Sequence, residues 1–168
     1  MNLRNATVAD AAACLATYGP IVRDTAISFE LEVPDRKTFT ERIAVALDRY
    51  AWLVAEDDDG LLGYAYATAH RDREAYRYAV ETSVYVGEAR RRGGVGKALY
   101  HRLFEVIADR GFYNAYAGVT VPNPASLAFH KACGFVEIGV FPAVGFKLGA
   151  WQDVSWWHRN LRTGTPED

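Results

Sequence analysis

One short stretch of the chain has residue types suited to binding an anion. It reads Arg90-Arg91-Arg92-Gly93-Gly94-Val95-Gly96-Lys97 and precedes an apolar run. Glycines let the backbone approach a ligand closely, and the arginines add positive charge. If a helix begins here, its N-terminal N–H groups add partial positive charge. The stretch therefore predicts a cradle for phosphate groups, and above all for a pyrophosphate.

The elements that flank this turn follow from residue type and spacing. The residues before it, 80–86, are mostly β-branched or aromatic and contain no helix or strand breaker, which predicts a strand. After it, Val95, Leu99, Leu103 and Ile107 recur at helical spacing. We therefore expect a strand that leads through the basic turn into a helix.

Two common phosphate-binding motifs are excluded by single positions. A P-loop requires glycine where Arg91 stands and Ser or Thr where Ala98 stands. A dinucleotide fingerprint requires a third glycine where Leu99 stands. The remaining pattern, Arg91-x-x-Gly94-x-Gly96, resembles the acetyl-CoA motif of the GNAT superfamily of N-acetyltransferases.

A second segment strengthens this resemblance. Asn123-Pro124 opens a short apolar stretch that ends in Gly134-Phe135, and it is similar to the late GNAT signature. With His130 where most of the superfamily has tyrosine, the chain resembles phosphinothricin N-acetyltransferases and the related methionine sulfoximine and sulfone acetyltransferases from residue 3 to about 161. The resemblance implies an α/β GNAT fold, a mixed central sheet flanked by helices, with acetyl-CoA bound at splayed central strands.

Two titratable residues are the candidate catalytic groups. An ammonium cannot attack a thioester until a base removes its proton, and the family match points to Glu81, on the predicted central strand, as that base. His130 is expected to relay a proton or to donate one to the departing CoA thiolate. The other histidines, His70, His101 and His158, have no such context and are expected to be structural or exposed.

The resemblance also implies how acetyl-CoA is held. The backbone of the central strand is expected to pair with the pantetheine arm as an added strand does. The basic turn is expected to take the pyrophosphate, and two residues of the second segment to contact the arm near the thiol. The predicted cofactor-binding residues are Val84, Tyr85, Val86, Arg91, Arg92, Gly93, Gly94, Val95, Gly96, Lys97, Asn123 and Ser126.

The acceptor site is predicted by resemblance to the same enzymes. Arg73 and Tyr76 match positions that contact the anionic and polar groups of the acceptor, and Phe29 matches an aromatic wall of its site. An arginine fork suits the carboxylate of an α-amino acid. Glu30 after Phe29, and Arg77-Tyr78 at the end of the loop, depart from the family members and leave the acceptor's identity open.

The remaining elements are expected in the order strand, helices, hairpin, strand, helix, strand, helix, strands. Thr7 to Asp10 matches a capping box that starts a helix, and Gly19-Pro20 is expected to end it. A further helix is expected up to residue 50, followed by a hairpin with its turn at 57–60. The last strands are expected at 135–140, 146–151 and 153–161, and their tryptophans in the core or a dimer interface.

Composition sets limits on the class of protein. The 168 residues, half of them hydrophobic and with net charge −2, suit a single domain, 1–168, with a frayed tail from about 163. The N-terminus lacks a signal-peptide core and no stretch suits a membrane span, so we expect a cytoplasmic protein. Nucleic acid, membrane and metal are not expected as partners. The two cysteines, Cys14 and Cys133, are expected to be reduced packing residues, and the family resemblance implies a homodimer.

The leading hypothesis is an enzyme that acetylates the α-amine of a small amino-acid analogue such as phosphinothricin or methionine sulfoximine. A GNAT enzyme for another amine, a peptide N-terminus or a polyamine, is the first alternative. A polyamine favours an acidic groove, whereas Arg71, Arg73 and Arg77 make the acceptor loop basic. The second alternative is a non-catalytic acyl-CoA-binding module, which has no need of Glu81 and His130 together.

Overall fold

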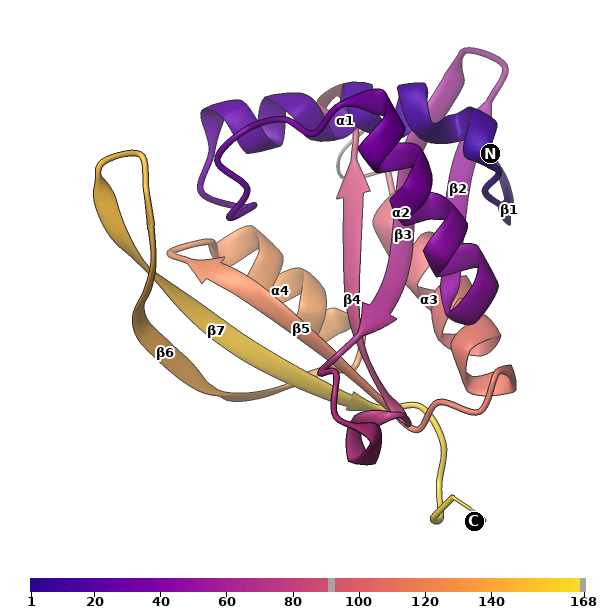
Figure 1. Cartoon of the computed structure of the whole chain (residues 1–168), viewed down its shortest axis with the longest axis vertical. Helices are drawn as coiled ribbons and strands as arrows, with labels where there is room; N and C mark the ends of the chain where they lie inside the picture. The colour runs from indigo at the N-terminus through magenta and orange to yellow at the C-terminus, as the bar shows by residue number, and fades with distance from the viewer. Residues whose placement is uncertain (91–92, 167–168) are drawn as a thin grey trace.

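The chain folds around one mixed β-sheet with helices on both faces (Figure 1). The structure is a computed structural model that describes residues 1–90 and 93–166. The strands are β1 (Asn2–Asn5), β2 (Ala51–Asp57), β3 (Gly60–Ala69), β4 (Ala79–Val86), β5 (Asn114–Val121), β6 (Val136–Lys147) and β7 (Ala150–Asn160). They form a sheet in the order β1-β2-β3-β4-β5-β7-β6, in which β4 and β5 pair in parallel and every other pair in the described part of the chain is antiparallel. The expected mixed sheet flanked by helices is confirmed.

Within the described residues, four α-helices and three single 3₁₀ turns complete the fold. The α-helices are α1 (Ala11–Asp24), α2 (Arg36–Arg49), α3 (Val95–Asp109) and α4 (Pro124–Ala132), and the 3₁₀ turns are η1 (Val8–Asp10), η2 (Glu74–Tyr76) and η3 (Glu88–Arg90). Asp35 caps α2 by accepting the Thr38 N–H at 2.7 Å, as a helix N-cap residue does.

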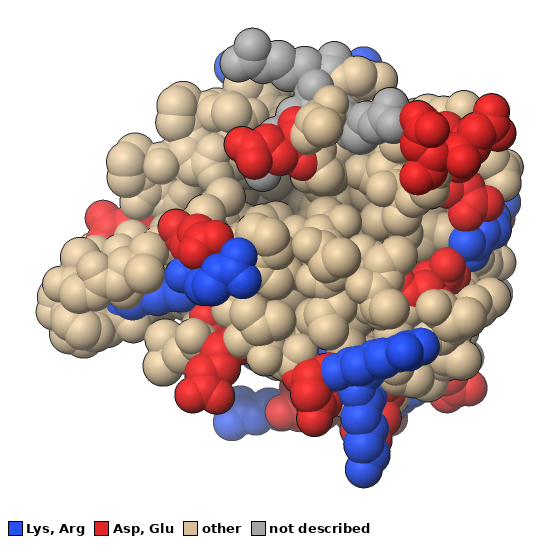
Figure 2. Space-filling model, turned by 90° about the horizontal axis from the view of Figure 1, so that it is seen from above, with Lys and Arg blue, Asp and Glu red and all other residues tan. Residues whose placement is uncertain are grey.

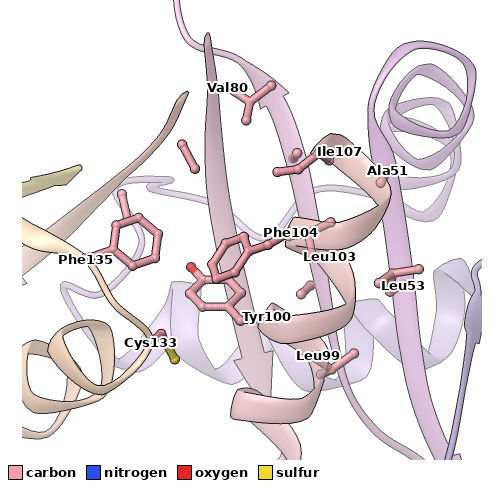
Figure 3. Packing of buried hydrophobic residues seen from close by; sticks show 14 of the residues in the cluster. Ala51, Leu53, Val80, Leu99, Tyr100, Leu103, Phe104, Ile107, Cys133 and Phe135 are labelled. Atoms are coloured by element: carbon pink, nitrogen blue, oxygen red, sulfur yellow. The ribbon is translucent and has the colours of Figure 1, made fainter. Parts of the chain in front are cut away.

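The two faces of the sheet have separate cores, because successive strand residues point to opposite sides. On one face α3 contributes Leu99, Leu103 and Ile107, all fully buried, which point toward the strands in Figure 3. On the other face α1 and α2 cover a cluster that includes Trp52 and Tyr64. Cys14 and Cys133 are buried and free in these two different clusters, so their expected role as packing residues is confirmed.

The prediction that Gly19-Pro20 ends the first helix is wrong. Helix α1 continues through Pro20 to Asp24, and the predicted capping box surrounds η1 instead, where the Thr7 N–H donates to Asp10 at 2.7 Å. Proline costs a backbone hydrogen bond inside a helix. Ile21 and Val22 are buried beyond it, so tertiary packing offsets that cost.

The prediction for the C-terminal strands is also partly wrong. Residues 136–147 form one long strand, β6, and the hairpin turn to β7 lies at Leu148-Gly149. Leu148 and Gly149 both have positive φ, at 53° and 76°, which a tight turn between antiparallel strands requires. Trp157 lies where β7 pairs with β5 and is buried, whereas Trp151 lies beyond that pairing, next to the hairpin turn, and is two-thirds exposed.

In the described part of the chain, no helix has the length and apolar character that crossing a membrane requires.

Candidate active site

The two central strands separate after a short parallel contact. Strands β4 and β5 pair only over Ala79–Asn114, Val80–Ala115 and Glu81–Tyr116. Beyond Tyr116, β5 stays paired with β7 on its other side and turns away from β4, as Figure 1 shows. The edge of β4 that faces away from β3 therefore has no neighbouring strand after Glu81. The result is a wedge in the middle of the sheet with Glu81 at its vertex.

A cleft of about 640 Å³ occupies this wedge. Its lining comes from both strands, from the start of α3 and from α4. The lining residues are Ile21, Ile27, Thr82, Ser83, Val84, Tyr85, Val86, Gly94, Val95, Gly96, Lys97, Tyr100, Gly118, Val119, Thr120, Asn123, Ala125, Ser126, Phe129 and His130. Ile21 and Ile27 belong to the α1 side of the sheet, whereas Tyr100 and His130 belong to the other side. The cleft therefore passes between the strands from one face to the other.

The first turn of α3 forms the outer end of the cleft. Gly94 precedes the helix with φ +79°, a conformation that glycine adopts without steric cost. Its carbonyl accepts the first helical bond, from Ala98 N–H at 3.0 Å, so the N–H groups of Val95, Gly96 and Lys97 have no partner within the helix. A Cβ on Gly96 would lie 3.3 Å from the Phe129 ring, which shows that α3 approaches α4 closely here.

Not all of the predicted phosphate turn lines the cleft. Gly94, Val95, Gly96 and Lys97 do so, whereas Gly93 is exposed and is not among the lining residues. Arg91 and Arg92 were predicted to bind the pyrophosphate, and they lie outside the described residues. On the opposite wall, Asn123 caps α4 by accepting the Ser126 N–H at 3.1 Å. The prediction of a helix opened by Asn123 is confirmed.

His130 lies on the inner wall of the cleft, on the α3 and α4 side. Its Nδ1 is 2.8 Å from the Ser126 carbonyl, which only accepts, so the neutral ring has its hydrogen at Nδ1. Nε2 is 3.4 Å from the Tyr100 hydroxyl, which also lies 3.3 Å from the Thr82 carbonyl. Burial lowers the pKa of His130, and the bond to Ser126 opposes this shift only in part. The imidazole is therefore neutral near pH 7, with a lone pair at Nε2.

Glu81 faces the other side of the sheet, because it precedes Thr82 on a strand. His70, the first residue after β3, places Nδ1 3.0 Å from Glu81 Oε1. The structure does not bring Glu81 and His130 together on one face; they flank the vertex of the wedge from opposite sides. His70 therefore contacts a candidate catalytic residue, whereas His101 is exposed on α3.

The predicted acceptor residues differ in how they are connected to Glu81. The Tyr76 ring stands edge-on to His70, with centroids 5.6 Å apart. Arg73 is exposed and precedes η2 as its N-cap residue. The Phe29 ring lies directly against Gly145 of β6, where a Cβ would clash with it. Tyr76 thus adjoins Glu81 through His70, and Phe29 joins the loop after α1 to the last hairpin.

Sequence reasoning missed His70 and Tyr100. His70 is 11 residues from Glu81 in the chain, and only the antiparallel pairing of β3 with β4, in which Thr68 faces Glu81, brings the two side chains together. Tyr100 belongs to the apolar stripe of α3 and is buried. Its hydroxyl was the one signal that this position has more than a packing role, because a buried Tyr O–H usually finds a partner.

Comparison with known proteins fits this geometry. Residues 20–135 match the model of the Acetyltransferase (GNAT) family. The chain belongs to the GNAT family. The phosphinothricin N-acetyltransferase of Alcaligenes faecalis is 42% identical to this GNAT chain over 92% of the chain and 80% of the relative. The L-methionine sulfoximine/L-methionine sulfone acetyltransferase of Salmonella typhimurium is 33% identical over 96% and 95%.

A solved GNAT structure shares the fold closely. The phosphinothricin acetyltransferase of Sinorhizobium meliloti, solved in complex with AcCoA, is 36% identical and has a TM-score of 0.92. The alignment covers 98% of this chain and 90% of that one. The splayed strands of this GNAT chain are thus part of a fold that is known with AcCoA bound.

The buried imidazole predicts how folding stability depends on pH. Because burial holds the native pKa of His130 below 6.5, the unfolded chain takes up this proton first as the pH falls below 6.5. The free energy of unfolding contributed by His130 is therefore fully retained above pH 6.5 and declines below it. Urea denaturation at about pH 7.5 and about pH 5.5 measures this decline, which we expect to be smaller in His130→Phe.

His101→Phe is the matched control, because His101 is exposed. We expect it to lose as much stability on acidification as the unmodified protein does. An equal decline in His130→Phe and in the unmodified protein would contradict the assignment of a buried, neutral imidazole.

Proposed function

We propose that this protein transfers the acetyl group of acetyl-CoA to the α-amine of a small amino-acid analogue such as phosphinothricin, methionine sulfoximine or methionine sulfone. The observation that carries the proposal is the wedge between β4 and β5, which has the backbone of Glu81 at its vertex and a helix N-terminus at its outer end. The named activities of the relatives supply the class of acceptor.

The residues of the cleft fit acetyl-CoA, which supplies the activated acetyl thioester. The unpaired edge of β4 around Val84 suits an extended arm with amide groups, which pairs as an added strand would. The unbonded N–H groups at the start of α3 suit a pyrophosphate, and Lys97 adds a positive charge there. Asn123 and Ser126 stand opposite, on α4, where the arm approaches the vertex.

Glu81 is the group we assign to removing the proton of the acceptor's ammonium. Its backbone is fixed between Thr68 of β3 and Tyr116 of β5, so the carboxylate starts from a rigid position. The freed amine lone pair attacks the thioester carbonyl, and the C–S bond breaks to release a thiolate. Deprotonation by a positioned carboxylate accelerates such a step about 10²- to 10⁴-fold.

His130 is assigned to the proton that the departing thiolate needs. Burial lowers the pKa of His130, so the ring does not hold a proton ready at neutral pH. The Tyr100 hydroxyl lies beside Nε2. Because the pKa of the ring is lowered, a proton that binds at Nε2 is readily donated to the thiolate. Of the two expected roles, this environment supports the relay rather than the standing proton donor.

The alternatives differ in the acceptor. The loop before β4 carries Arg71, Arg73 and Arg77, all exposed, and this charge favours an acceptor with a carboxylate over a polyamine. In a peptide, the α-carboxyl group of the N-terminal residue forms an amide bond, so no α-carboxylate lies beside the N-terminal amine. A non-catalytic acyl-CoA-binding module does not account for a carboxylate fixed at the vertex of the wedge.

A thiol-release assay with acetyl-CoA and a panel of acceptors tests the proposal. The panel contains phosphinothricin, methionine sulfoximine, methionine sulfone, natural amino acids, spermidine and a short peptide. We expect turnover of the methionine-like analogues and, in Glu81→Gln, a kcat reduced about 100-fold or more with KM for acetyl-CoA unchanged. Glu74→Gln, which changes an exposed carboxylate on η2, is the matched control and retains activity. Turnover of spermidine or peptide alone would discard the proposed acceptor.

A charged side chain at the start of α3 tests the phosphate cradle. We expect Gly96→Asp to raise KM for acetyl-CoA by about tenfold or more, because it places a negative charge where the pyrophosphate is proposed to bind. Gly96→Asn has nearly the same shape and no charge, so it reports the steric cost of the contact with Phe129. Equal KM values for the two variants would refute the electrostatic part of the proposal.

We also propose that two copies of the chain pair through β6. This strand is the edge of the sheet, and the hairpin it forms with β7 projects at the left of Figure 2, where its tip shows no charged side chain. Its exposed apolar residues are Val136, Ile138, Val140, Phe141, Val144, Phe146, Leu148 and Trp151. An exposed apolar edge strand favours pairing with another chain. Sedimentation equilibrium at micromolar concentration should give twice the mass of one chain, and the mass of one chain would refute the pairing.

The proposed location is the cytoplasm. Cys14 and Cys133 are both free, which suits a reducing compartment, and acetyl-CoA is available there. Cell fractionation tests this.

A further inference from the structure

Among residues 1–90 and 93–166, His70 is the polar contact that the structure gives to the carboxylate of Glu81. His70 Nδ1 lies 3.0 Å from Oε1, with the His70 side chain 15% exposed and the Glu81 side chain 33% exposed. A carboxylate oxygen only accepts, so the hydrogen of this bond is on the ring. We propose that His70 is a positioning residue that donates to Oε1 and so aims Oε2 of Glu81 at the acceptor amine. The inference rests on the proposed role of Glu81 as the base.

Three aromatic side chains hold the imidazole in the orientation that this bond needs. The ring stacks on Tyr116 of β5, with centroids 4.6 Å apart and planes 20° apart. Tyr76 of η2 and Trp156 of β7 meet it edge-on, at 5.6 Å and 6.4 Å. The contacts come from three separate elements, so rotation of the ring is opposed from several sides. A ring fixed in this way presents Nδ1 in a constant direction.

The bond matters because the rest of Glu81 is only partly fixed. Pairing with β3 and β5 holds its backbone, but a glutamate side chain has several rotatable bonds and adopts many rotamers in solution. General-base catalysis requires the accepting oxygen within hydrogen-bond distance of the proton that it removes. One bond to Oε1 selects the rotamers that keep the other oxygen facing the wedge, and it does so without any contact between His70 and the acceptor.

Two substitutions at position 70 separate positioning from packing. His70→Phe keeps a ring against Tyr116 and removes the donor, whereas His70→Asn removes the ring and keeps an N–H near the place of Nδ1. For positioning, we expect His70→Phe to lower kcat roughly tenfold with KM for acetyl-CoA unchanged, and His70→Asn to restore kcat to within about threefold. A packing role predicts the reverse order, in which His70→Phe is the active variant, and that result would overturn the proposal.

A matched control and a coupled variant complete the kinetic test. His101→Asn, at an exposed histidine of α3, should leave kcat unchanged. His70→Phe combined with Glu81→Gln should be no slower than Glu81→Gln alone, because the bond has no carboxylate left to aim. A further loss in the double variant would mean that His70 acts independently of Glu81, and it would overturn the inference.

A crystal structure of His70→Phe tests the positioning role of His70 without a measurement of activity. We expect the Glu81 carboxylate to leave its position or to occupy several rotamers, whereas an unchanged carboxylate would overturn the positioning role. If the unmodified protein acetylates no acceptor in the panel, the proposed function fails. The crystal structure of His70→Phe then still tests whether His70 fixes the position of the Glu81 carboxylate. Suppose instead that the unmodified protein is active and that Glu81→Gln has a reduced kcat whereas His70→Phe does not. In that case only the inference about His70 fails.

Discussion

The site depends on one constraint of the sheet, the separation of β4 from β5 after three paired residues. Strand β5 pairs with β7 from Asn114 to Val121 but with β4 only as far as Tyr116, so beyond that residue it follows β7 and leaves β4. The wedge therefore opens between two parallel strands, where a strand edge, a helix N-terminus and a strand-borne carboxylate converge. Unpaired backbone groups inside a protein need partners, and in this fold a ligand with amide groups can supply them.

The two proposed catalytic residues lie on opposite faces of the sheet, on either side of the wedge. Alternation along β4 sends Glu81 to the face covered by α1 and α2, and it sends Thr82 to the face where α3 and α4 bring Tyr100 and His130. The proposed base and the proposed relay are thus separated by the sheet and meet only at the opening between the strands. An acceptor that enters from one face and a thiol released on the other would not compete for the same space.

Several features were predictable because they depend on local sequence. Asn123 and Asp35 cap their helices through their own side chains, and Gly94 permits the turn before α3 by its own backbone freedom. Residue spacing also identified the central strand and the amphipathic stripe of α3. Pro20 was misjudged because its local cost is offset by Ile21 and Val22, which are buried against elements distant in sequence. Likewise, β6 extends to Lys147 because β7 pairs with it, which no local signal records.

The sequence by itself determined most of the elements, and it identified the candidate phosphate turn and the candidate acid–base residues, because these follow from residue type, short-range spacing and family motifs. Only the tertiary structure decided which of those residues meet. It placed Glu81 and His130 on opposite faces, joined His70 to Glu81, and brought the Tyr100 hydroxyl to His130. The physical reason is that strand register and helix packing bring together side chains that lie 11 and 30 residues apart in the chain. Contacts of this kind are set by the pairing of whole elements, which the spacing within one element does not reveal.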